Sequence, residues 1–254
     1  MSRRFWSIVL VLALGTSASA QRRDEVLVSA ASSLTNVLQQ IARVYEAQTG
    51  ARIALNFGAS NTLARQIAAG APVDLFISAD EAQMNVVRDE TIAQTRVDLL
   101  SNQLAIAVPT DRPRVVRSAR DLANPSFKRI ALGDPAAVPA GVYARRYLEH
   151  TGIWPLIAPK VIPSATVRLA LAAVETGAAD AAIVYRTDVA AARRATLAFV
   201  VPLAEGPRIL YPAAVVRSAP HAEAAKRFLT FLRSPAAADI FSRAGFLPVP
   251  DAAR

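Results

Sequence analysis

The stretch I-A-L-N-F-G-A-S-N-T-L-A-R-Q-I-A-A-G-A-P-V-D-L-F-I-S-A-D, residues 53–80, holds the structural unit that recurs along this chain. The apolar run at 53–57 predicts a β-strand, and a turn of small residues follows it. The apolar positions within 63–67 have helical spacing, and the run at 73–77 predicts the next strand. Strand and helix patterns alternate in the same way further along, which predicts an α/β fold with largely parallel sheets.

Four of the predicted strand-to-helix turns contain hydroxyl groups or glycine. They are Ser32-Ser33, Ala59-Ser60, Pro139-Ala-Gly141 and Ser164-Ala-Thr-Val167. The first N–H groups of a helix have no partner within the helix and carry a partial positive charge, so a helix start binds an anion without a formal cation. Each turn by itself is more simply the N-cap of its own helix. Together, the four predict an anion site if the fold brings them to one edge of the sheets.

The composition limits the class of protein. The chain has 254 residues, 53% of them apolar and 19% charged, which is enough for a sizeable core and excludes a disordered chain. It has no cysteine, so a disulfide scaffold, a thiol nucleophile, an iron–sulfur cluster and a lipid anchor on cysteine are all excluded. Two histidines leave almost nothing for a histidine-based metal site.

The N-terminus has the three parts of a secretory signal. Arg3 and Arg4 make a basic start, an apolar run follows at 5–14, and small residues end the pattern at Ala20. The apolar run is well short of the roughly 20 residues that span a bilayer. We therefore expect residues 1–20 to be a cleaved signal peptide and the mature protein to be soluble and outside the cytoplasm, in the periplasm.

The formal net charge of +9 raises nucleic acid as a partner. However, the basic residues are scattered as short pairs and are not interleaved with the aromatic residues on which bases stack. We expect a solvated basic surface and no binding of nucleic acid.

The sequence contains no phosphate-binding, dinucleotide, zinc-protease or serine-hydrolase motif. His150 and His221 both lie at the ends of helical patterns, where we expect them at the surface. The acidic residues are spread along the chain, and no two of them stand out as a catalytic pair. A hydrolase stays open but unsupported, and we expect that the protein is not an enzyme.

The sequence resembles the periplasmic molybdate-binding proteins, the solute receptors of ABC-type molybdate importers. The resemblance covers nearly the whole chain after the signal peptide. Its matching stretches are A-A-S-S-L-T-N (30–36), N-T-L-A-R-Q-I-A-A-G-A-P-V-D-L-F-I-S-A-D (61–80), G-D-P-A-A-V-P-A-G-V-Y-A (133–144), V-R-L-A-L-A-A-V-E (167–175), I-V-Y (183–185) and A-A-D-I-F-S-R-A-G-F (237–246).

The resemblance implies a type II periplasmic binding protein, in which two lobes are joined by two crossover strands that form a hinge. Lobe one would comprise residues 24–103 and 209–254, and lobe two residues 104–208. Strand patterns near 103–108 and 209–216 are in the right places to cross between them. The partners implied are the transmembrane subunits of an ABC permease, and we expect a monomer without a cofactor.

The resemblance also implies a ligand set at five positions. Ser33 and Ser60 would each donate from a hydroxyl and an amide, Ala140 and Val167 from their amides, and Tyr185 from its phenol. The first four fall on the helix starts marked above, whereas nothing but the resemblance singles out Tyr185. Molybdenum would enter only as molybdate, with no protein ligand bonded directly to the metal.

A set of neutral donors suits an oxyanion that carries no proton. Molybdate is fully deprotonated at pH 7 and only accepts hydrogen bonds, whereas phosphate carries a proton there and needs an acceptor. Tungstate shares the property of molybdate. Sulfate shares it too, so a receptor for sulfate or for another oxyanion is the alternative that the sequence leaves open.

Overall fold

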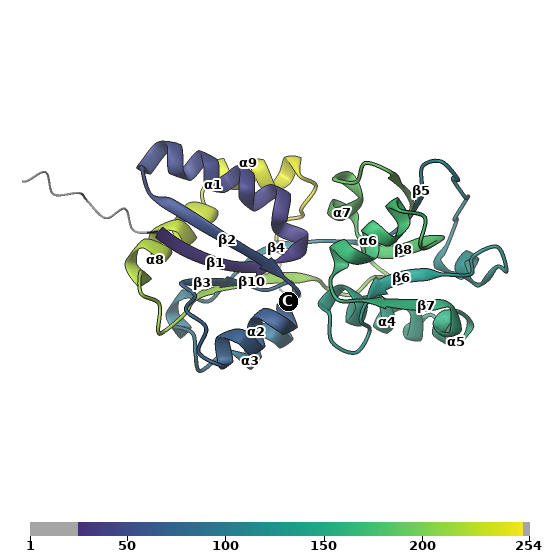
Figure 1. The fold of residues 1–254 in the computed structure, drawn as a ribbon, viewed down its shortest axis with the longest axis horizontal. Coiled ribbons are helices and arrows are strands. Elements are labelled where there is room, and N and C mark those ends of the chain that lie inside the picture. Colours follow the sequence, from purple (N-terminus) through teal and green to yellow (C-terminus); the bar gives the residue numbers. More distant parts are fainter. Residues whose placement is uncertain (1–24, 251–254) are drawn as a thin grey trace, which may run out of the picture.

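The computed structural model describes residues 25–250, which form two five-stranded sheets lying side by side (Figure 1). The expected signal peptide at 1–20 lies outside the described residues and stays a prediction. No helix in the described part of the chain is both long and apolar enough to cross a membrane.

The first sheet and its helices make up lobe one. Its strands follow the order β2-β1-β3-β10-β4. Helices α1 and α9 cover one face, and α2 and α3 cover the other (Figure 1). The elements are β1 (Glu25–Ala31), α1 (Thr35–Thr49), β2 (Arg52–Gly58), α2 (Ser60–Ala68), β3 (Leu75–Ile77), α3 (Glu81–Val86), β4 (Val97–Ser101), β10 (Leu210–Val215), α8 (Ala222–Leu232) and α9 (Pro235–Arg243), with short 3₁₀ helices η1 (Ser32–Leu34) and η2 (Ala93–Thr95).

The second sheet and its helices make up lobe two, with the strand order β7-β6-β8-β5-β9. Its elements are β5 (Leu104–Pro109), β6 (Ile130–Gly133), α4 (Pro139–His150), α5 (Trp154–Ile157), β7 (Val161–Ser164), α6 (Val167–Glu175), β8 (Ala181–Tyr185), α7 (Arg186–Ala190) and β9 (Ala195–Val200), with 3₁₀ helices η3 (Ala119–Ala123) and η4 (Ala158–Lys160).

Both sheets are mixed. The prediction of largely parallel sheets is wrong, because antiparallel strand pairs are as frequent as parallel ones. β1 is parallel to β2 and β3, and β6 is parallel to β7 and β8. β10 is antiparallel to β3 and β4, and β5 is antiparallel to β8 and β9. Both exceptions directly follow a passage between the lobes that contains no helix. The strand–helix–strand crossover that makes neighbours parallel is therefore missing before β5 and β10.

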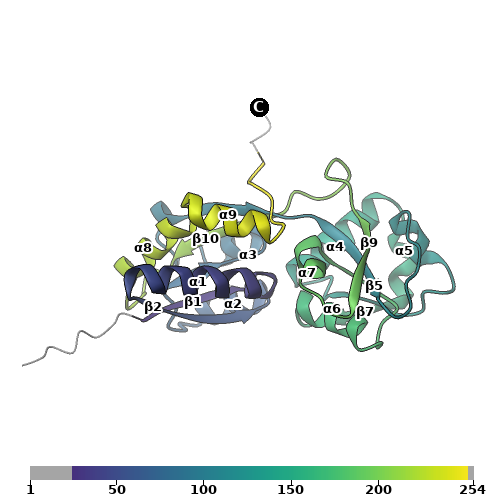
Figure 2. The same cartoon turned by 90° about the horizontal axis from the view of Figure 1, so that it is seen from above.

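The chain passes between the lobes twice, at 102–103 and at 201–209, and both passages are visible from above (Figure 2). We propose lobe boundaries at the positions expected above, with 24–103 and 209–254 in lobe one and 104–208 in lobe two. The order of the strands in the two sheets supports this division, because β4 ends before 103 and β10 begins after 209.

Burial of apolar faces explains the local structure. The spacing of Val37, Leu38, Ile41 and Tyr45 predicts one apolar face of α1, and all four are buried against the sheet. The helix ends at Gly50, whose φ of +71° lies in the left-handed region that favours glycine.

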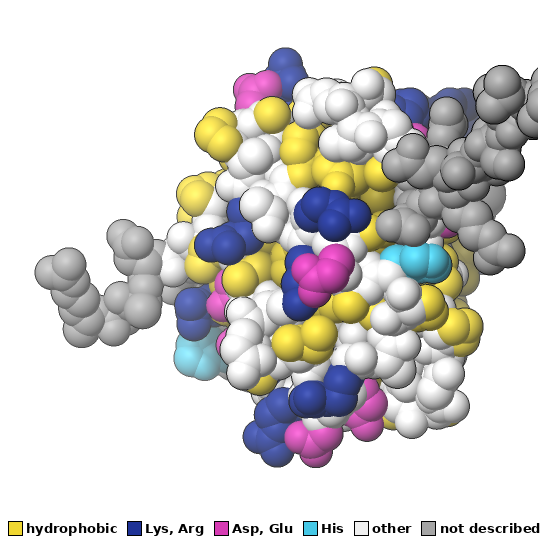
Figure 3. Space-filling view, turned by 90° about the vertical axis from the view of Figure 1, so that its left-hand side faces the viewer, with side chains coloured by type: hydrophobic (Ala, Val, Ile, Leu, Met, Phe, Trp, Pro, Cys, Tyr) yellow, Lys and Arg dark blue, Asp and Glu magenta, His cyan; other side chains and the backbone are white. Residues whose placement is uncertain are grey.

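The basic residues do not form a continuous patch on the end of lobe one. In the view onto that end, Lys and Arg side chains are separated by acidic, apolar and uncharged groups (Figure 3). This arrangement agrees with the expectation of a solvated basic surface on that face.

Candidate functional site

A small cavity lies where the carboxyl ends of the parallel strands meet between the lobes. The register pairs Ala31 at the end of β1 with Gly58 at the end of β2, and both residues line the cavity. The helices that follow the parallel strands therefore begin at this edge, as expected for ligand sites in open α/β sheets. The lining residues are Ala31, Ser32, Ser33, Gly58, Ala59, Ser60 and Ala79 from lobe one, and Val138, Pro139, Ala140, Val167 and Tyr185 from lobe two.

All five residues of the implied ligand set line this one cavity: Ser33, Ser60, Ala140, Val167 and Tyr185. The empty space, including that at the mouth, is about 200 Å³. The part of it that the centre of a water-sized sphere can occupy is only about 10 Å³, far below the roughly 300–1,000 Å³ of pockets that bind drug-sized molecules. The cavity thus suits a small ion better than a sugar, a nucleotide or a peptide.

The helix starts at the cavity are mostly free of side-chain caps. No side chain caps η1 at Ala31, α2 at Ala59 or α4 at Val138. Only α6 has such a cap, because the hydroxyl of Thr166 accepts a hydrogen bond from the N–H of Leu169 at 3.1 Å. The N-cap interpretation of the four turns therefore holds for one of them, and the other three leave first-turn N–H groups without a capping side chain.

A close approach of backbones fixes the start of α4. A Cβ atom placed on Gly141 would lie 1.9 Å from the carbonyl oxygen of Gly133, at the end of β6. Only glycine permits this contact, which holds the amide of Ala140 at the cavity.

The hydroxyl of Ser60 has its orientation set by a backbone amide. Its Oγ accepts a hydrogen bond from the N–H of Ala79 at 2.9 Å. Because an N–H group only donates, the Ser60 proton is directed elsewhere and can be donated to a ligand. Ser60 is 1% exposed, so its hydroxyl is shielded from bulk solvent.

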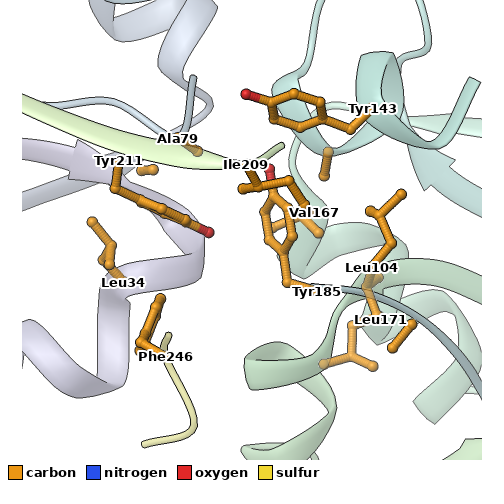
Figure 4. Packing of buried hydrophobic residues seen from close by; sticks show 14 of the residues in the cluster. Leu34, Ala79, Leu104, Tyr143, Val167, Leu171, Tyr185, Ile209, Tyr211 and Phe246 are labelled. Carbon is orange, nitrogen blue, oxygen red and sulfur yellow. The ribbon is translucent and has the colours of Figure 1, made fainter. Parts of the chain in front are cut away.

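The phenol of Tyr185 faces the space between the lobes (Figure 4). Tyr185 is buried at the end of β8, and its hydroxyl has no hydrogen-bond partner in the described part of the chain. Burial raises the pKa of Tyr185 well above its usual value. The phenol therefore stays protonated at neutral pH and is an unused donor.

Two charged residues next to the cavity lining, Arg168 and Asp188, are paired with each other. Arg168 follows Val167 on α6, and its Nε lies 2.8 Å from Oδ1 of Asp188. Its Nη2 also donates to the carbonyl oxygen of Ser33 at 3.4 Å, across the gap between the lobes. Burial raises the pKa of Asp188 to about 6, although the charge of Arg168 opposes the shift. Neither residue is among those that line the cavity, so the lining offers no charged acceptor.

The two histidines lie away from the cavity. His150 is exposed, as expected. His221 is half-buried, so its expected exposure is wrong. Its backbone N–H donates to Oδ1 of Asp74 at 2.8 Å, and its Nδ1 lies 3.4 Å from Oδ2 of the same carboxylate. Asp74 is almost fully buried, and His221 supplies it with a donor. Within residues 25–250, no three His, Cys, Asp or Glu side chains come together as a group that could hold a metal ion.

Sequence reasoning missed two groups that support the site. One is the backbone N–H of Ala79, which only the contact between its loop and α2 brings to Ser60. The other is Tyr211 on β10, whose hydroxyl lies 3.1 Å from Oγ of Ser33. A tyrosine within an apolar strand normally indicates core packing, so no sequence signal distinguishes Tyr211.

Comparison with known proteins gives a family and similar structures. The profile of the bacterial extracellular solute-binding proteins matches residues 26–247. The molybdate-binding protein ModA of Escherichia coli (strain K12) is 39% identical over 228 residues, which are 87% of this chain and 88% of that protein.

A solved substrate-binding domain of a putative molybdenum ABC transporter from Clostridium difficile is 32% identical, with a TM-score of 0.69 over 89% of this chain and 99% of that one. The periplasmic molybdate-binding protein of Azotobacter vinelandii has a TM-score of 0.79 over 87% of this chain and 98% of that one. At 24% identity, the second structure supports the fold alone. The two-lobed α/β fold predicted from the sequence is confirmed.

Proposed function

Because this chain belongs to the bacterial extracellular solute-binding proteins, we propose that it captures molybdate outside the cytoplasm and delivers it to an ABC importer. Its similarity to the E. coli molybdate-binding protein over most of both chains supports this function. The protein is then a transport receptor and not an enzyme, and molybdate is its cargo and not a cofactor.

The observation that carries the proposal is the donor set of the cavity. Ser33, Ser60 and Tyr185 contribute hydroxyls, and Ala140 and Val167 lie at the first turns of their helices. All of these groups are neutral and can donate. Molybdate at pH 7 accepts hydrogen bonds and has no proton to give, so its oxygens match such a site without a buried cation.

Contacts from both lobes explain how the importer would distinguish the loaded protein from the empty one. Ser33 and Ser60 belong to lobe one, whereas Ala140, Val167 and Tyr185 belong to lobe two. An ion held by both groups favours the closed arrangement, in which the lobes turn about the passages at 102–103 and 201–209. The permease would then recognise the closed, loaded monomer. Cleavage after Ala20 would leave this monomer free in the periplasm.

Sulfate is the second candidate, because it is also fully deprotonated at neutral pH and only accepts hydrogen bonds. Size alone separates it from molybdate and tungstate. The small volume of the cavity makes such discrimination physically reasonable, since closely packed donors do not adjust freely to a smaller ion.

Calorimetric titration of residues 21–254 with molybdate, tungstate, sulfate and phosphate tests the proposal. We expect tight binding of molybdate and tungstate, weak binding of sulfate and none of phosphate. Equal binding of sulfate would retain the oxyanion receptor and overturn the assignment to molybdate. Absence of binding to all four ions would refute the proposal.

A further inference from the structure

We propose that Tyr211 and Asn102 are positioning residues that hold the Ser33 hydroxyl as a hydrogen-bond donor toward the cavity. The inference rests on the proposed function, because it concerns how the same cavity holds its anion. Neither residue lines the cavity. Both act through Ser33, in a chain of three side chains that runs from the passage between the lobes to the cavity.

The series of hydrogen bonds begins at Asn102, and a backbone N–H sets the orientation of its side-chain amide. Its Oδ1 accepts a hydrogen bond from the N–H of Gln103 at 2.8 Å. Because that N–H only donates, the side-chain oxygen of Asn102 must face Gln103, and its NH₂ group must face away from Gln103. The Nδ2 atom then donates to Tyr211 Oη at 3.2 Å and to Thr187 Oγ1 at 2.9 Å. Asn102 is 2% exposed, so these are the partners that its buried amide has.

The next member is Tyr211, which is fully buried on β10. Burial raises the pKa of its phenol, so the hydroxyl keeps its proton at neutral pH. Its oxygen accepts from Asn102, and its remaining partner in the described part of the chain is Ser33 Oγ at 3.1 Å. The Tyr211 proton is therefore donated to Ser33. Figure 4 shows the Tyr211 hydroxyl directed into the region between the lobes.

The consequence falls on the proton of Ser33. A serine hydroxyl has one proton and rotates freely, so it can donate to a ligand or accept from one. Once its oxygen accepts from Tyr211, its own proton is directed away from Tyr211. Ser33 lines both the cavity and a second hollow beside Thr187, and the proposed direction of the proton is toward the cavity. A hydroxyl that is already fixed as a donor matches an anion that only accepts. Because it is fixed before the anion arrives, it loses no rotational freedom on binding.

Ser60 reaches the same result through a backbone amide, that of Ala79. Of the possible substitutions at position 79, only proline removes that amide. The direction of the Ser33 hydroxyl, in contrast, depends on two side chains, and Asn102 also contacts Thr187 at the start of α7 in lobe two. Substitutions of these side chains can therefore test how the Ser33 hydroxyl is oriented.

A double-mutant cycle tests the inference. We expect Tyr211→Phe to raise the Kd for molybdate about tenfold, because the Ser33 hydroxyl becomes free to rotate. In the Ser33→Ala background, the same change should alter the Kd by less than about twofold, since the group on which Tyr211 acts is gone. Tyr45→Phe is the matched control, because it removes a buried phenol that packs against Phe228 and does not line the cavity.

The outcomes separate the inference from the function on which it rests. Failure of the wild-type protein to bind molybdate would overturn the proposed function. If the wild type binds molybdate normally and Tyr211→Phe has an unchanged Kd, the positioning role of Tyr211 is overturned and the proposed function still stands. Losses that multiply in the double variant would also overturn the positioning role, because they indicate a general structural role. If Tyr211→Phe does not fold by circular dichroism, Asn102→Ala enters the same cycle, since it keeps the phenol and removes the donor that orients it.

Discussion

Replacement of Ser60 by alanine probes the proposed site at a hydroxyl with a defined direction. In the wild type, Ser60 Oγ accepts from the N–H of Ala79 at 2.9 Å, and its proton is available to the ligand. Ser60→Ala removes that donor from a buried site that is to hold a doubly charged ion. A hydrogen bond to a charged group contributes about 1.5–3 kcal/mol, so the Kd for molybdate should rise about 10- to 150-fold.

The same substitution also affects the ligand-free protein, because it leaves the Ala79 N–H buried without its acceptor. This loss should lower the free energy of unfolding by about 1–3 kcal/mol. Calorimetric titration at pH 7.5 measures the first effect, and denaturant unfolding without ligand measures the second. The loss of affinity is attributed to the donor only if the variant remains folded at the temperature of the titration.

Ser29→Ala is the matched control for this variant. Ser29 is 1% exposed on β1, and its Oγ accepts from Asn56 Nδ2 at 3.1 Å, but it does not line the cavity. We expect a loss of stability with an unchanged Kd. If Ser60→Ala binds molybdate as tightly as the wild type does, the Ser60 hydroxyl is no donor to the ligand and the reasoning is refuted.

Three further substitutions test other parts of the site. Gly141→Ala should displace α4 and abolish molybdate binding, because its Cβ would lie 1.9 Å from the Gly133 oxygen; titration of a folded variant with wild-type affinity would contradict this. Tyr185→Phe should raise the Kd about tenfold without lowering the melting temperature of the ligand-free protein, since its hydroxyl has no partner within residues 25–250; a melting temperature lower by several degrees would argue against an unused donor. Burial raises the pKa of Asp188 to about 6, so ionisation of Asp188 disfavours the folded state and its contribution to stability falls as the pH rises from about 4 to 6. The unfolding free energy of the wild type minus that of Asp188→Asn should therefore fall by up to about 3 kcal/mol over that range, and a difference independent of pH would disprove it.

Local patterns in the sequence predict much of the fold. The apolar spacing of α1 and the glycine that ends it are visible without a structure, since both are short-range effects. β4 has no such signal, because it is a five-residue edge strand interrupted by Asp98. The directions of β5 and β10 are also hidden, since they depend on how the chain passes between the lobes.

The candidate site divides in the same way. Four strand-to-helix turns are visible as patterns, but their convergence on one cavity follows only from the fold. Tyr185 is suggested by resemblance alone, because a buried tyrosine at a strand end usually packs in the core. Tyr211 and Asn102 lie 109 residues apart and meet only through the pairing of β10 with β4. Their role therefore depends on tertiary contacts that no local pattern contains.

The central claim is that a cavity of neutral donors between the lobes selects a tetrahedral oxyanion that carries no proton and is larger than sulfate. Its most direct test is calorimetric titration of residues 21–254 with molybdate in the presence of a large excess of sulfate and phosphate. We expect one molybdate per chain, bound about as tightly as without the competitors. Loss of the molybdate heat in their presence, or a wild-type protein that binds no molybdate at all, would contradict the account.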